Sequence, residues 1–112
     1  MVKYINGKEL EELIASTDKT VFCDFWATWC GPCKAMHPVL DSVQEQLSSL
    51  VDVVRVDIDR PENCFLADHF RIHAVPTLIL FREGRLLWRH SGVMTTQELT
   101  NELRHQERLE VY

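Results

Sequence analysis

The feature that most constrains the fold is a run of β-branched and aromatic residues from Thr20 to Trp26. A dense apolar run of this length is typical of a strand that is buried on both faces. Asp24 lies inside the run and is its one anomaly, because a buried carboxylate needs compensation. The commoner explanation of such a residue is a structural salt bridge, and Arg55 on the next predicted strand could point to the same side.

Helical and strand periodicities alternate along the rest of the chain. Further strands are predicted at Val51–Ile58, Thr77–Phe81 and Leu86–His90, with the last two joined as a hairpin through Gly84. Helices are predicted at Lys8–Ser16, Pro32–Leu50, from Asp59 to about Phe70, and from Thr95 toward Leu109. This order predicts an α/β sheet with parallel strands inside and an antiparallel edge.

Composition narrows the class of protein. The chain has 112 residues, 46% of them apolar, which predicts a single domain over residues 1–112 with a real core. Its formal charge of −5 disfavours nucleic acid as a partner, and no long apolar run suggests a membrane span. The segment Met1–Gly7 has no apolar signal core, so a cytoplasmic location is expected. The absence of a long apolar edge favours a monomer.

A cysteine pair, Cys30-Gly31-Pro32-Cys33, lies between the buried strand and the long helix. Proline suits the first turn of a helix, so Cys30 is expected at or just before the helix N-terminus. Unpaired backbone N–H groups and the helix dipole favour a thiolate there. Cys33 follows one turn later on the same face, close enough to form a small disulfide. The pair can therefore attack a substrate disulfide with Cys30 and resolve the mixed disulfide with Cys33.

Other interpretations of these cysteines are weaker. A Cys-x-x-Cys pair could be half of a zinc site, with His37 as a third ligand. A structural zinc needs four ligands, and Cys23 and Cys64 do not form a second pair at ligand spacing. No metal site is therefore expected. Cys23 is interpreted as an inert core thiol and Cys64 as a cysteine near the start of the third helix, with no assigned role.

The segment from Phe25 to Lys34 reads FWATWCGPCK and resembles the active-site segment of the thioredoxin family. The similarity covers nearly the whole chain and continues, at compatible distances, through Asp24, Pro38, Val75-Pro76-Thr77, Phe81, Gly84 and Gly92. It implies the thioredoxin fold, a five-stranded mixed sheet flanked by four helices. It also implies a thiol–disulfide oxidoreductase that reduces disulfides in client proteins.

The resemblance assigns roles to the residues of the reaction. Cys30 would be the nucleophile and Cys33 the resolving thiol, while Gly31 and Pro32 would tune the redox potential toward the reducing side. Asp24 would accept the proton of the resolving cysteine, helped by burial that raises its pKa.

The family more often has lysine where this chain has Arg55. Arginine stays charged and pairs in a bidentate fork, so it should hold Asp24 ionised more firmly.

The resemblance also implies a binding surface. Pro76 would be cis and face the cysteine pair, presenting the backbone of Val75 to an extended substrate peptide. Trp29, Val75 and Gly92 would form a flat apolar patch around the thiols.

No bound cofactor is implied, because the two sulfurs of the redox-active Cys30–Cys33 disulfide carry the electrons when they are reduced to the dithiol. The oxidised form would be recharged by a thioredoxin reductase that draws on NADPH. A disulfide isomerase and a thioredoxin-fold binding module remain the alternatives.

Overall fold

The computed structural model describes the backbone of residues 2–111 and the side chains of residues 2–107. Five strands form one sheet in the order β1-β3-β2-β4-β5. Strand β1 is parallel to β3 and β3 to β2, whereas β4 is antiparallel to β2 and β5 to β4. The predicted mixed sheet, parallel inside with an antiparallel edge, is confirmed. Its strands are β1 (Lys3–Tyr4), β2 (Thr20–Trp26), β3 (Val51–Asp57), β4 (Thr77–Arg82) and β5 (Arg85–Ser91).

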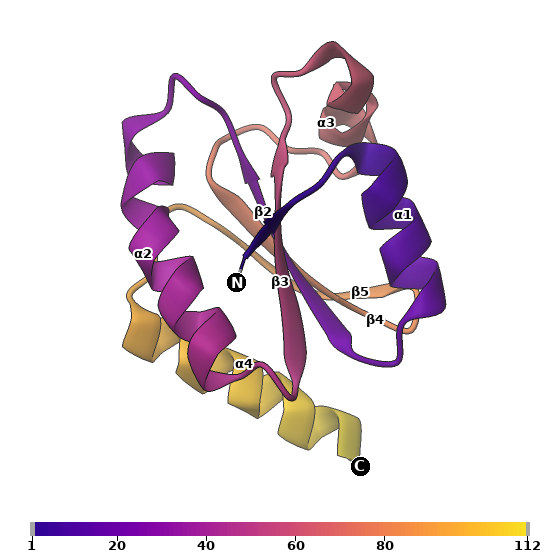
Figure 1. Ribbon diagram of the computed structural model, residues 1–112, viewed down its shortest axis with the longest axis vertical. Coiled ribbons are helices and arrows are strands. Elements are labelled where there is room, and N and C mark those ends of the chain that lie inside the picture. Colours follow the sequence, from indigo (N-terminus) through magenta and orange to yellow (C-terminus); the bar gives the residue numbers. More distant parts are fainter. Residues whose placement is uncertain (1, 112) are drawn as a thin grey trace.

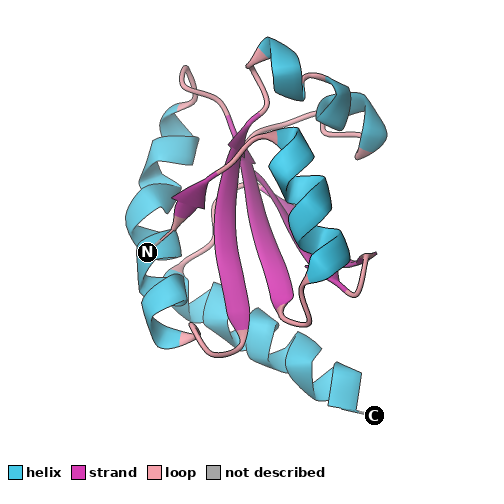
Figure 2. Ribbon diagram, turned by 45° about the vertical axis from the view of Figure 1, so that its right-hand side comes forward, coloured by secondary structure: helices cyan, strands magenta, loops and turns pink. Residues whose placement is uncertain are grey.

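Helices cover both faces of this sheet (Figures 1 and 2). Helices α2 (Gly31–Gln46) and α4 (Thr96–Val111) pack on one face, and α1 (Gly7–Ser16) and α3 (Phe65–His69) on the other. Leu109, which the sequence placed on the last helix, lies outside the described side chains. Among the described residues, no helix is both long and apolar enough to cross a membrane.

Strand β2 divides the core into two layers, as its dense apolar run predicts. Phe22 packs with Met36 of α2 and Leu99 of α4, whereas Phe25 packs with Leu10 of α1 on the opposite face. Successive side chains of a strand point to opposite faces, so β2 contributes to both layers. Asp24 therefore shares a face with Phe22, on the side of the sheet that α2 covers.

Local sequence signals fix the helix starts. The Asn6 side chain accepts a hydrogen bond from the Glu9 N–H, and Glu9 accepts one from the Asn6 N–H, which is a capping box. Thr95 and Glu98 form the same reciprocal pair at the start of α4. At the hairpin, Glu83 and Gly84 both adopt positive φ, which fits a two-residue turn between antiparallel strands.

The predicted continuous helix from Asp59 to Phe70 is wrong. A 3₁₀ turn, η1 (Pro61–Asn63), precedes the short helix α3, and Asp59 does not cap either element. The cause is the buried side chain of Asn63, which accepts from the Gly7 N–H and donates to the Asp57 carbonyl. These long-range bonds fasten the segment to the start of α1 and to β3, and sequence periodicity does not reveal them.

Helix α2 ends at Gln46, so the end at Leu50 that the apolar spacing predicts is wrong. The chain turns into β3 at this point, with the N–H groups of Leu50 and Val51 both donating to the Leu47 carbonyl.

A side chain of α2 also bonds to the start of β3. Gln44 donates to the Val51 carbonyl and accepts from the Val53 N–H, at distances of 3.2 and 2.8 Å. Strand β1 pairs with Val54 and Arg55 of β3. The two Gln44 bonds therefore satisfy backbone groups at the start of β3 that β1 does not reach.

Candidate active site

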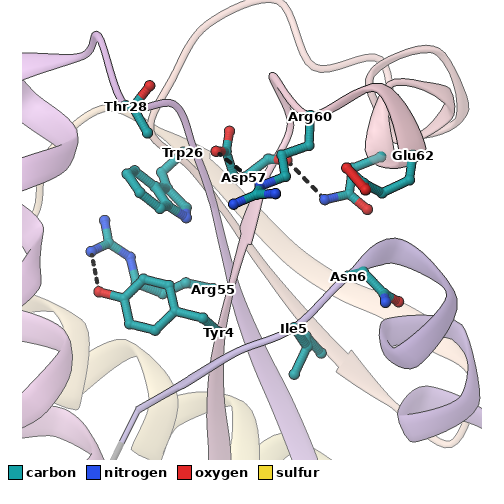
Figure 3. Close-up of a pocket in the computed structure, with 10 residues that line it drawn as sticks. Tyr4, Ile5, Asn6, Trp26, Thr28, Arg55, Asp57, Arg60 and Glu62 are labelled. Carbon is teal, nitrogen blue, oxygen red and sulfur yellow. Dashed lines mark hydrogen bonds and ion pairs between the residues drawn. The ribbon is translucent and has the colours of Figure 1, made fainter.

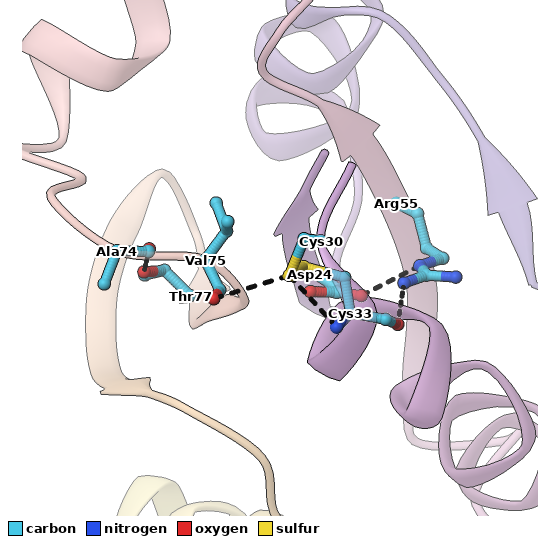
Figure 4. Close-up of a disulfide and its surroundings, with 7 residues drawn as sticks. All are labelled: Asp24, Cys30, Cys33, Arg55, Ala74, Val75 and Thr77. Carbon is cyan, nitrogen blue, oxygen red and sulfur yellow. Dashed lines mark hydrogen bonds and ion pairs between the residues drawn. A yellow bond between two sulfur atoms is a disulfide. The ribbon is translucent and has the colours of Figure 1, made fainter. Parts of the chain in front are cut away.

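The cysteine pair lies where β2 leads into α2. Cys30 is the N-cap residue of α2, and its Sγ accepts a hydrogen bond from the Cys33 N–H at 3.1 Å. The two sulfurs form a disulfide with a Cα–Cα distance of 5.3 Å (Figure 4). Cys30 is 4% exposed and Cys33 is fully buried. The predicted placement of both cysteines is confirmed, and only Cys30 has any contact with solvent.

A loop before β4 faces the Cys30 sulfur. The Val75–Pro76 peptide bond is cis, as predicted, and the Val75 carbonyl oxygen lies 3.6 Å from Cys30 Sγ (Figure 4). The Gly92 N–H donates to the Pro76 carbonyl at 2.8 Å, which brings Gly92 to the same loop. Trp29 is 69% exposed just before the pair. The structure therefore brings Val75, Pro76 and Gly92 to the thiol side, while their binding role stays a prediction.

Beneath the pair, Asp24 forms a buried ion pair with Arg55. Arg55 Nε donates to Asp24 Oδ2 at 2.8 Å, and their side chains are 3% and 0% exposed. Arg55 Nη2 also donates to the Cys33 carbonyl at 2.8 Å, so one guanidinium joins Asp24 to the start of α2 (Figure 4). The sequence-based pairing of Asp24 with Arg55 is confirmed.

Burial gives Asp24 unusual acid–base properties. Desolvation raises the pKa of Asp24 from 3.8 to about 6, although the charge of Arg55 and its hydrogen bond act in the opposite direction. Asp24 Oδ1 is buried and accepts no hydrogen bond from any described group of the protein. Burial, and secondarily the Asp24 charge, also raise the pKa of Cys23 well above its usual range. This carboxylate therefore has an oxygen free to hold a proton, and Cys23 is an inert thiol near neutral pH.

Sequence reasoning missed the groups around Arg55. Tyr4, opposite Arg55 in the β1–β3 register, accepts from Arg55 Nη1 at 3.3 Å. His37 Nδ1 lies 3.2 Å from Arg55 Nη1 and 2.8 Å from the Tyr4 hydroxyl. The signal for His37 in the sequence is its position one turn after Cys33. That position suggested His37 as a zinc ligand and not as a partner of Arg55. Among the described residues, no three His, Cys, Asp or Glu side chains are placed to hold a metal ion.

A cleft of about 360 Å³ opens beside this cluster, at the carboxyl ends of the parallel strands (Figure 3). Tyr4, Trp26 and Arg55 line it together with Asp57 and Arg60. Trp26 Nε1 is buried without a hydrogen-bond partner. The guanidinium carbon of Arg55 lies 4.9 Å from the Trp26 ring centroid, at the wall of this cleft.

Comparisons with known proteins agree with this geometry. The thioredoxin family model matches residues 1–105. Thioredoxin 1 of Chlorobaculum tepidum is 35% identical over 97 residues, covering 87% of this chain and 94% of that protein. Chloroplastic thioredoxin Y2 of Arabidopsis thaliana is 39% identical over 93 residues, covering 83% of this chain and 54% of the relative. The chain thus spans about half the length of this plant protein.

A solved structure extends the similarity to the fold. The crystal structure of chloroplastic thioredoxin z superposes with a TM-score of 0.86 at 34% identity, covering 96% of this chain and 95% of that one. Sequence, fold and the disulfide at the start of α2 agree. The chain belongs to the thioredoxin family.

Proposed function

We propose that the chain is a protein-disulfide reductase that transfers electrons from Cys30 and Cys33 to client proteins. The observation that carries the proposal is the asymmetry of the pair. Cys30 caps α2 beside the surface, and Cys33 lies fully buried one turn along the same helix. Such an arrangement leaves Cys30 nearer the surface for clients and reserves the Cys33 sulfur for an internal second step.

The reaction begins with the dithiol form. The Cys30 thiolate attacks one sulfur of a client disulfide, and the other client sulfur leaves as a thiolate that takes a proton. Cys33 then loses its proton and attacks Cys30 Sγ, which breaks the mixed disulfide and releases the second client thiol. Two electrons pass to the client, and the chain is left with the Cys30–Cys33 disulfide present in the structure.

The start of α2 favours the thiolate form of Cys30. The Cys33 N–H already points at Cys30 Sγ at 3.1 Å, and the positive end of the helix dipole lies at the same place. Both interactions stabilise a negative charge on sulfur and lower the thiol pKa of an N-capping cysteine. Cys30 is therefore the nucleophile of the proposal.

Asp24 is the group proposed to take the proton from Cys33. Its pKa of about 6 leaves it mostly ionised near neutral pH, yet close enough to that pH to exchange protons. Its Oδ1 has no other partner. Arg55 ties this carboxylate to the Cys33 carbonyl, which keeps the acceptor near the resolving residue.

Clients are proposed to bind as extended segments beside Cys30. The Val75 carbonyl faces the sulfur, and the cis Pro76 has no N–H to pair elsewhere. An extended peptide can pair with the Val75 backbone, as strands do when they add to an edge. Trp29 and Gly92 would supply the apolar surroundings. Gly31 and Pro32 would set the redox potential.

Turnover needs a source of electrons for the oxidised pair. We propose an NADPH-dependent thioredoxin reductase as that source, with the chain acting as a cytoplasmic monomer. Cys23 and Cys64 remain free thiols, which is compatible with a reducing compartment. Fractionation of the cell, with immunodetection of the chain, tests the location.

Trapping of clients tests the proposed function. In Cys33→Ser, attack by Cys30 should proceed and the mixed disulfide should accumulate, whereas Cys30→Ser should trap little. Insulin reduction by dithiothreitol should be accelerated by the wild type and by neither variant. Equal trapping by both variants would contradict the assigned roles. Client binding that survives in the double serine variant, without any reduction by the wild type, would indicate a binding module.

A further inference from the structure

Arg55 of β3 is held by groups from three other elements, β1, β2 and α2. Nε binds Asp24 of β2, Nη2 binds the Cys33 carbonyl of α2, and Nη1 faces Tyr4 of β1 and His37 of α2. The guanidinium carbon also lies over two aromatic rings, 5.7 Å from the Tyr4 centroid and 4.9 Å from that of Trp26. The hydrogen-bond directions and the ring planes together fix its orientation.

The imidazole of His37 lies against both the guanidinium and the Tyr4 hydroxyl. Its Nδ1 atom is 3.2 Å from Arg55 Nη1, a group that can only donate. The Tyr4 hydroxyl lies 2.8 Å from the same nitrogen, and the opposite ring nitrogen lies 3.6 Å from Asp41 Oδ2. The His37 side chain is 49% exposed, so the cluster runs from the surface to the buried Asp24.

The planar shape of the guanidinium couples its two ends. Nε and Nη2 reach Asp24 and Cys33 only while the plane keeps its present direction. Without acceptors for Nη1, a buried donor would lose its partners, at a cost that favours rotation toward the adjoining cleft. Such a rotation would lengthen the Asp24–Arg55 bond.

We propose that Tyr4 and His37 are positioning residues, which hold the Arg55 guanidinium in the orientation that pairs with Asp24 and with the Cys33 carbonyl. The value of this arrangement for catalysis rests on the proposed function, in which Asp24 takes the proton of Cys33. The orientation itself does not depend on that function. Neither residue was singled out for this role by the sequence.

Few charged or titratable groups lie directly beside Asp24. On the two flanking strands its direct neighbours are Arg55 of β3 and the apolar Leu78 of β4. The other titratable or charged groups of strands β1 to β4 are Cys23 on β2, Lys3 and Tyr4 on β1, Asp52 and Asp57 on β3, and Arg82 on β4. Helix α2 adds Cys33, Lys34, His37, Asp41 and Glu45, with Cys30 as its N-cap. Of these and Arg55, Arg55 is the group whose charge favours the ionised form of Asp24.

The test is a titration of the Asp24 carboxyl carbon by NMR, in the disulfide form, where Cys30 and Cys33 do not titrate. Tyr4→Phe and His37→Leu should each raise the midpoint by about half a pH unit, a fraction of what an adjacent opposite charge produces. Arg55→Met should raise it most, because the whole guanidinium is lost.

Two matched variants separate positioning from other effects. His37→Asn places an amide oxygen near the site of Nδ1 and should restore the wild-type midpoint, whereas a pure charge effect of the imidazole would not be restored. His105→Gln changes an exposed histidine of α4 and should leave the midpoint unchanged. In the Arg55→Met background, Tyr4→Phe and His37→Leu should cause no further shift.

An Asp24 midpoint that does not move in Tyr4→Phe and His37→Leu would overturn the proposal. A shift of the same size in the Arg55→Met background would also overturn it, since the effect would then bypass the guanidinium. Insulin reduction by the wild type is a separate readout. If it failed while the midpoints shifted as expected, the proposed function would fall and the positioning roles would stand.

Discussion

Among the described residues, the two shortest arginine–carboxylate pairs have similar lengths and very different surroundings. Arg55 meets Asp24 at 2.8 Å, with side chains 3% and 0% exposed. Arg82 meets Glu107 at 2.7 Å, with side chains 25% and 21% exposed. Both oxygens of Glu107 are bound, one by Arg82 and one by the Thr20 hydroxyl, whereas Asp24 Oδ1 has no partner.

This difference separates a structural tie from the group that is proposed to take a proton. Glu107 joins α4 to the ends of β2 and β4, and each of its oxygens has a donor. Asp24 is desolvated more than its single ionic partner can offset, so its pKa rises to about 6. A similar bond length therefore accompanies two different roles, and burial with an unfilled acceptor position distinguishes them.

Replacing each arginine should produce the largest difference in stability between the two pairs. At pH 7, Arg55→Met should lower the free energy of unfolding by roughly 3–5 kcal/mol, because it leaves a buried carboxylate without its cation. Arg82→Met should cost about 1 kcal/mol, because solvent reaches Glu107. Urea unfolding measures both changes. Equal losses would show that burial does not separate the two pairs.

The pH dependence of stability sharpens the comparison. The folded chain holds the Asp24 proton more tightly than the unfolded chain, since its pKa is raised from 3.8 to about 6. Binding of this proton adds about 3 kcal/mol to the free energy of unfolding. This contribution is fully present below about pH 4 and is lost as the pH rises through about 6.

The difference between wild type and Asp24→Asn in urea unfolding should reveal this change. Glu107→Gln retains Asp24 and should retain the change between pH 4 and 6, which makes it the matched control. A wild-type profile parallel to that of Asp24→Asn would contradict the raised pKa of Asp24.

A second effect of about 1 kcal/mol concerns the Arg82–Glu107 pair alone. Thr20→Val removes the hydroxyl that donates to Glu107 and should lower the free energy of unfolding by about 1 kcal/mol, the usual value of one hydrogen bond. Client trapping by Cys30 should not change, because Thr20 lies at the opposite end of β2 from the cysteines. A change in trapping would mean that the two pairs are coupled through the strand.

Much of the fold could be predicted because its signals are local. The run from Thr20 to Trp26 identified the central strand, and the residues before Leu10 identified the start of α1. Strand β1 was not found by periodicity, since two residues carry no pattern. The break in the helix after Asp59 depends on Asn63 and its contact with Gly7, 56 residues away.

The same distinction between local and long-range signals applies to the residues of the candidate site. Cys30 and Cys33 are neighbours on one helix, and Asp24 and Arg55 lie opposite each other on adjacent strands, so sequence reasoning could pair them. Tyr4 and His37 meet Arg55 only because the sheet order places β1 next to β3 and α2 lies across that face. That meeting is a property of the tertiary structure, which single-sequence patterns do not contain.

In the proposed reaction, the place of Cys33 one turn from Cys30 determines how long a client stays attached. A mixed disulfide on Cys30 could in principle be cleaved by any small thiol in solution, at a rate set by the concentration of that thiol. Cys33 is held one turn away, so its effective concentration at the Cys30 sulfur far exceeds that of any thiol in solution. The lifetime of the covalent complex is then set by the protein and is insulated from fluctuations in the surrounding thiol pool.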